Sequence, residues 1–92
     1  MDYLEAISEI KRKLGEAKEY DTARIISNAQ IKGGGSSGEV LAIICSLLKV
    51  YEKKFPSIFF IIKDDAKFLY AVSKQIGMSI IPDYNLLDEL DW

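Results

Sequence analysis

The sequence contains no histidine and only one cysteine, Cys45. Histidine is the most common general base, the most common zinc ligand and a member of the usual nucleophile triads, so its absence argues against most hydrolases. A lone cysteine cannot form an intrachain disulfide, which points away from secreted disulfide-rich domains and toward a reducing compartment such as the bacterial cytoplasm. We therefore expect a cytoplasmic protein that is not an enzyme.

The chain also lacks a convincing pattern for a metal, a cofactor or covalent catalysis. The side chains of Asp64 and Asp65 diverge on any regular element, and no calcium-loop motif is present. Ser46-Leu47-Leu48-Lys49 matches the spacing of serine–lysine acyl enzymes, but Ser8-Glu9-Ile10-Lys11 matches it too and the partner motifs are missing. Ser46 and Cys45 are better interpreted as buried helix residues. We expect no metal and no cofactor.

Concentrated positive charge and long apolar runs are missing as well. Twelve basic residues against fourteen acidic ones give a net charge of -2, and the basic residues are scattered, so no nucleic-acid interface is expected. The apolar stretch from Val40 to Leu48 is far shorter than the roughly 20 residues of a membrane helix. The first residues show neither the basic region nor the apolar region of a signal peptide, so we expect no secretory leader and no membrane association.

A length of 92 residues and 49% apolar residues predict one globular domain over residues 1–92. Apolar residues recur at intervals of three and four from Asp2 to about Tyr20, with a break or kink possible at Gly15, which predicts an amphipathic helix. Further helices are predicted over about 23–32, where Asp21-Thr22 offers the cap, and over about 38–54, where Ser36 offers it. A short acidic helix is expected near the end of the chain.

Two interpretations remain open for residues 56–81. In the first, Pro56 begins a helix that runs to Gly77 and leaves Asp65 on the apolar side, a costly place for a carboxylate. In the second, residues 57–62 and 78–81 are strands of a small parallel sheet, with Asp64 and Asp65 capping the helix between them. We favour an all-α protein, an orthogonal or antiparallel bundle of four to five helices, with the α/β fold as the alternative.

Residues 33–38 form a glycine-rich segment that we interpret as an inter-helix loop. The segment reads Gly33-Gly34-Gly35-Ser36-Ser37-Gly38 and satisfies the spacing of the dinucleotide fingerprint. The fingerprint normally follows an apolar strand, however, and Glu39 would place a carboxylate where phosphate binds. A nucleotide- or anion-binding α/β module that uses this loop is the alternative function.

The charge of the chain is uneven at its end. Residues 1–77 carry twelve basic and ten acidic side chains, whereas residues 78–92 carry four acidic and no basic ones. Aromatic residues set among carboxylates suit a surface that attracts and docks a basic partner. The alternative is that Leu86, Leu87 and Leu90 pack on the core while the acidic residues are merely solvated. The candidate partner-binding residues are Asp83, Tyr84, Asp88, Glu89, Asp91 and Trp92.

The sequence as a whole indicates a small acidic protein that acts by binding another protein. An inhibitor, immunity or antitoxin-like factor, whose acidic surface covers a cationic site, fits the small size and the missing catalytic groups. Neither the identity of that partner nor the oligomeric state follows from the residues.

Overall fold

The amphipathic pattern of the chain produces helices throughout. The computed structural model describes all 92 residues and contains six helices and no strand. The helices are α1 (Tyr3–Glu16), α2 (Tyr20–Gly33), α3 (Ser37–Lys54), α4 (Pro56–Ile61), α5 (Lys63–Gln75) and α6 (Leu86–Glu89). The predicted all-α fold is confirmed. The alternative α/β fold is wrong, because residues 57–61 lie in α4 and residues 78–81 have no regular structure.

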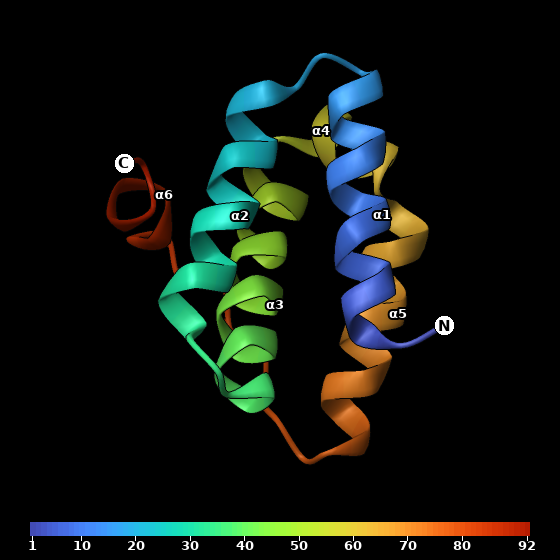
Figure 1. Cartoon of the computed structure of the whole chain (residues 1–92), viewed down its shortest axis with the longest axis vertical. Coiled ribbons are helices and arrows are strands. Elements are labelled where there is room, and N and C mark those ends of the chain that lie inside the picture. Colours follow the sequence, from blue (N-terminus) through green and yellow to red (C-terminus); the bar gives the residue numbers. More distant parts are fainter.

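Helices α1, α2, α3 and α5 form an antiparallel bundle around one apolar core (Figure 1). Contacts run from α1 to α2, from α2 to α3, from α3 to α5 and from α5 back to α1, so the four helices close a ring. The stripe expected on the first helix provides Ile7, Ile10 and Leu14 to this core. The largest side chains from the other elements that are fully buried are Ile26, Ile44, Leu47, Leu48, Val50, Ile62, Leu69 and Leu90.

The C-terminal end of α1 and the start of α2 depart from the predicted boundaries. Asp2 caps α1 as expected, since its carboxylate accepts the main-chain N–H of Glu5 at 2.8 Å. The helix ends at Glu16, one residue after the predicted weak point, and Lys18 takes a left-handed conformation with φ 62°. The chain then enters α2 at Tyr20, so Asp21 lies in its first turn and the predicted cap at Asp21-Thr22 is wrong.

The glycine-rich segment is shorter as a loop than its composition suggests. Gly33 is the last residue of α2, and Ser37 and Gly38 already belong to α3. A Cβ atom on Gly33 would lie 2.5 Å from Val40 Cγ2 and 2.8 Å from Val40 Cα, so this glycine permits the close approach of the two helices. Ser36 caps α3 as predicted, accepting the N–H of Glu39 at 3.3 Å.

The helix expected from Pro56 to Gly77 is divided at Ile62. Pro56 begins α4 as predicted, but Ile62 leaves helical geometry (φ -118°, ψ 15°) and α5 starts at the next residue. Helix α4 crosses one end of the bundle from α3 to α5 (Figure 1), and α5 then runs beside α1 in the opposite direction. A continuous helix could not make both the crossing and the return.

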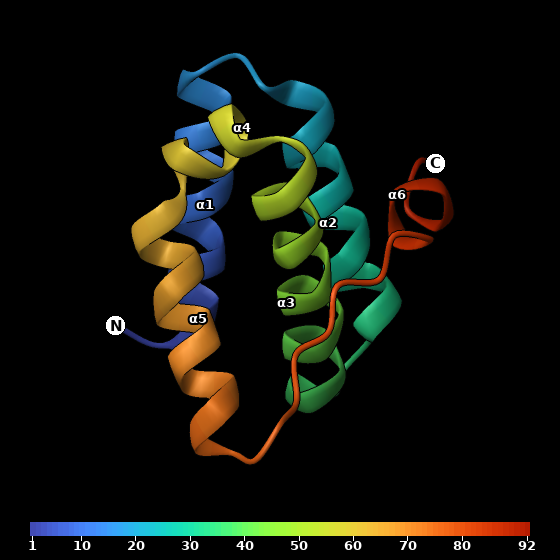
Figure 2. The same ribbon diagram turned by 180° about the vertical axis from the view of Figure 1, so that it is seen from behind.

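After Gly77 the chain runs back along α3 and ends beside α2 (Figure 2). We call residues 82–92 the C-terminal segment. Leu86 and Leu90 of this segment are buried, and the predicted short acidic helix is the single turn α6. None of the six helices combines the length and the apolar content that a membrane-crossing helix needs.

Candidate functional site

A polar stripe on α2 attaches the C-terminal segment to the bundle. Arg24, Asn28 and Lys32 lie one turn apart on this helix, and each contacts the C-terminal segment. The amide of Asn28 donates to the main-chain oxygens of Leu90 at 2.8 Å and Trp92 at 3.2 Å. Because Asn28 is itself buried, these bonds hold the backbone of the segment against α2.

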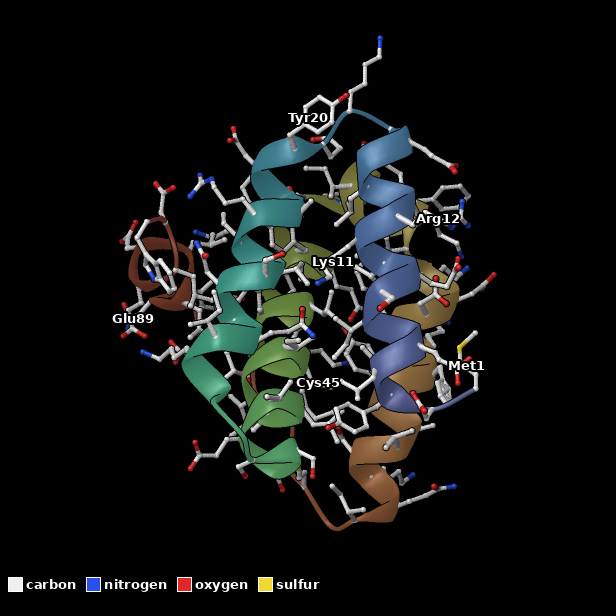
Figure 3. The ribbon with its side chains drawn as sticks, in the orientation of Figure 1. Met1, Lys11, Arg12, Tyr20, Cys45 and Glu89 are labelled. Atoms are coloured by element: carbon white, nitrogen blue, oxygen red, sulfur yellow. The ribbon has the colours of Figure 1, made fainter.

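Two of the predicted partner-binding carboxylates pair with this stripe. Arg24 donates to Asp91 at 2.7 Å and to the main-chain oxygen of Trp92 at 2.9 Å, and the pKa of Arg24 is raised, chiefly by the bond to Asp91. Glu89 lies 3.4 Å from the ammonium of Lys32, at the outer edge of the molecule (Figure 3). Asp91 and Glu89 therefore have cationic partners within the chain.

The other predicted site residues divide between two places. Asp88 forms no ion pair and lies beside α2. Trp92 also lies beside α2, and this residue is 59% exposed. Asp83 and Tyr84 lie farther back along α3, near Ser46. Asp83 accepts the N–H of Asn85 at 3.1 Å, and the ammonium of Lys54 lies 5.1 Å from the centre of the Tyr84 ring. The structure thus brings Asp88, Glu89, Asp91 and Trp92 together and leaves Asp83 and Tyr84 as a separate pair.

Asp88 and Asp91 border a groove that the sequence did not reveal. We call it the acidic groove; its volume is about 460 Å³. Its charged lining consists of Glu19, Asp21, Arg24, Asp88 and Asp91. Its uncharged lining consists of Thr22, Ile25, Tyr51, Phe55, Ile58 and Leu87. These residues come from the start of α2, the end of α3, α4 and α6, so the groove exists only in the folded chain.

The acidic groove combines an apolar floor with a negative rim. Tyr51 and Phe55 pack with ring centres 5.4 Å apart, and Phe55 remains 41% exposed while Tyr51 is buried. Burial raises the pKa of the Tyr51 hydroxyl, so this floor stays uncharged at neutral pH. Arg24 is the single cation of the lining, and it already lies 2.7 Å from Asp91 and 3.6 Å from Asp21.

Apart from Asp88 and Asp91, sequence reasoning missed the groove residues because nothing in their own segments marked them as a binding site. Asp21 suited a helix cap, and Phe55 preceded the Pro56 break. Glu19 belonged to no motif. One signal was present, since the acidic residues Glu19 and Asp21 follow each other closely, but their distance from the C-terminal segment could not be read from the chain.

A second hollow, of about 510 Å³, lies along α1 and offers less to a ligand. Its only apolar lining residues are Met1 and Leu4. Its buried carboxylate, Asp65, is paired with Lys13 at 2.6 Å, and this hydrogen bond raises the pKa of Lys13. The hollow therefore has neither an apolar floor nor an unpartnered buried group.

The remaining chemical groups are placed as structural residues. Cys45 lies inside the bundle (Figure 3), its Sγ atom 3.2 Å from the hydroxyl of Ser73, and burial raises the pKa of its thiol. No three acidic or thiol side chains lie close enough together to hold a metal ion.

The dinucleotide spacing at residues 33–38 follows helix α2, whereas the fingerprint it resembles follows a strand. Gly33, the first glycine of the pattern, is packed against Val40 and does not face solvent. Comparison with known proteins gives no match: no family model, no curated protein and no solved structure corresponds to this chain.

Proposed function

We propose that this protein acts by binding another protein through its C-terminal segment, as an inhibitor, immunity or antitoxin-like factor that covers a cationic site. The observation that carries the proposal is the way in which Trp92 is held. Its main-chain oxygen accepts hydrogen bonds from Arg24 and Asn28, yet its side chain is 59% exposed. A large aromatic side chain is thus presented at the surface by a backbone that is held against α2.

The packing of the segment does not require this exposed aromatic. Leu86 and Leu90 supply the buried apolar contacts, and Asn28 supplies the hydrogen bonds to the backbone. Tryptophan is a preferred anchor of protein interfaces, and an anchor whose backbone is already held loses less conformational entropy on binding. The arrangement supports a role in recognition.

The charges of the C-terminal segment support a basic partner. Asp88 and Asp83 have no cationic partner within ion-pairing distance, whereas Glu89 and Asp91 do. Unpaired surface carboxylates steer an oppositely charged protein during its approach and contribute a salt-dependent part of the affinity. A partner with a cationic active site would meet both the carboxylates and the aromatic side chain.

The test is affinity capture from an extract of the source cells with two matched variants. The site variant carries Asp83→Asn, Asp88→Asn and Trp92→Ala, and keeps Glu89 and Asp91 so that the segment stays attached. The control carries Glu5→Gln, Asp64→Asn and Phe60→Ala, which removes two exposed carboxylates and an exposed aromatic from α1, α5 and α4.

We expect a protein that the wild type and the control capture and that the site variant does not. Its capture should weaken as salt is raised, because part of the attraction is between charges at the surface. Equal capture of the same proteins by all three, at low and high salt alike, would show that the C-terminal segment is not the interface.

A further inference from the structure

We infer that the acidic groove receives an apolar or aromatic side chain from a basic amphipathic segment of the partner protein. This inference rests on the proposed function and adds the chemistry of the partner. It places the anchoring contact beside the C-terminal segment, at the junction of α2, α3, α4 and α6.

The floor of the groove provides the apolar part of the contact. Phe55 is 41% exposed, and Ile58 and Leu87 are half-buried around it, with Ile25 and Tyr51 buried below. A volume of about 460 Å³ lies within the range of about 300–1,000 Å³ that is usual for binding pockets, and it is large enough for one aromatic side chain. Covering Phe55 would remove apolar surface from water, which is the main source of affinity at such anchors.

The rim of the groove selects the charge of the occupant. Glu19 and Asp21 lie on the side of α2, and Asp88 and Asp91 lie on the side of α6. Four carboxylates against the single guanidinium of Arg24 leave three negative charges around the apolar floor. An acidic or neutral segment would lose the solvation of these carboxylates without compensation, whereas lysine or arginine side chains flanking the anchor would pair with them.

A second copy of this chain is the rival occupant. Phe60 is 74% exposed and lies next to Lys63, whose ammonium is 6.0 Å from the centre of its ring, so α4 and the start of α5 also present an aromatic residue beside a cation. If this face filled the groove of another copy, the contact would be head-to-tail and the protein would associate with rising concentration.

The experiment is an NMR titration of the ¹⁵N-labelled protein at low salt with a synthetic amphipathic peptide. The probe carries lysine and arginine on one face and a single tryptophan on the other, and a second peptide has serine in place of the tryptophan. We expect shifts confined to residues 19–25, 51–58 and 86–91, and at least about tenfold weaker binding of the serine peptide.

Two pairs of variants locate the contact. Phe55→Ser should weaken binding about tenfold, while Phe60→Ser, at the other exposed phenylalanine of this region, should leave it unchanged. Asp21→Asn with Asp88→Asn should weaken binding about tenfold at low salt and less at high salt, while Glu5→Gln with Asp64→Asn should not. Circular dichroism of each variant confirms that the helices are retained.

The inference is overturned if the peptide shifts spread over other acidic surfaces, if Phe55→Ser binds the probe like wild type, or if the protein alone fills its groove by self-association. Its failure can be told apart from that of the proposed function by capture with the Phe55→Ser variant. If the site variant loses a partner that Phe55→Ser still captures, the C-terminal segment is the interface and the groove is not part of it. If the peptide binds in the groove but the site variant captures the same proteins as wild type, the groove inference holds and the proposed function fails.

Discussion

At the scale of single residues, two glycines in helices serve different purposes. Gly33 lies at the contact of α2 with α3, where a Cβ atom would meet the backbone of Val40 at 2.8 Å. Gly15 lies near the end of α1, where a Cβ atom would meet nothing within 4 Å. Glycine weakens a helix by about 0.5–1 kcal/mol relative to alanine. Packing explains this loss of helix stability only at Gly33.

Alanine substitutions should therefore have opposite effects at these two positions. We expect Gly33→Ala to lower the free energy of unfolding by about 1–2 kcal/mol, because the overlap with Val40 exceeds the gain in helix propensity. Gly15→Ala should raise it by about 0.5–1 kcal/mol. Urea denaturation followed by circular dichroism measures both. Stabilisation by Gly33→Ala would mean that α2 and α3 can separate freely at this end.

At the scale of elements, two sides of α2 make different contacts. One side packs in the core through Ile26 and Ala29, and the other binds the C-terminal segment through Arg24, Asn28 and Lys32. The two ion pairs are exposed and contribute little each. The buried amide of Asn28 satisfies the main-chain oxygen of Leu90, which would otherwise lie buried without a donor.

Removal of this amide should release the segment from the bundle. We expect Asn28→Ala to increase hydrogen exchange at residues 86–92 and to lower the free energy of unfolding by about 1–2 kcal/mol. Gln30→Ala is the control, since Gln30 accepts a hydrogen bond at 2.6 Å from Lys11 of α1 and does not contact the segment. Unchanged exchange at residues 86–92 in Asn28→Ala would show that Leu86 and Leu90 alone hold the segment.

Also at this scale, α5 shows where inference from the sequence ends. The apolar period predicted one helix through this region, which the structure divides into α4 and α5 at Ile62. It also predicted that Asp65 would face the interior, which appeared costly. The structure relieves the cost with Lys13, a residue 52 positions away that reaches the carboxylate at 2.6 Å. Local periodicity contains no information on such a pair.

The candidate site was predicted to the same limited extent. The acidic and aromatic character of residues 82–92 was visible in the sequence, as was the burial of leucines along a short helix. The cations that pair with Glu89 and Asp91 lie on α2, more than fifty residues earlier in the chain. The acidic groove draws on four helices, so its existence depends on tertiary packing rather than on any motif.

At the scale of the whole molecule, four groups with raised pKa values act together above neutral pH. Burial raises the pKa values of Cys45, Tyr51 and Tyr70, and the hydrogen bond to Asp65 raises that of Lys13. For each group the unfolded chain releases its proton at a lower pH than the folded one. Their contributions to stability are thus fully present below the unfolded pKa values, 9.0 for the thiol, 10.0 for the tyrosines and 10.5 for the lysine, and are lost as pH rises through the folded values.

We therefore predict that the melting temperature falls steeply above about pH 9–10. Between its unfolded and folded pKa values, each of these groups lowers the free energy of unfolding by up to about 1.4 kcal/mol per pH unit. Tyr70→Phe should make the fall shallower, because it removes a phenol that burial and the neighbouring Glu52 carboxylate keep protonated in the fold. Tyr20→Phe, at a side chain that is 65% exposed, is the control. Thermal melts followed by circular dichroism from pH 7 to 11.5 provide the measurement. If the melting temperature of Tyr70→Phe falls with pH as steeply as that of wild type, the phenol of Tyr70 ionises in the folded protein as readily as in the unfolded chain.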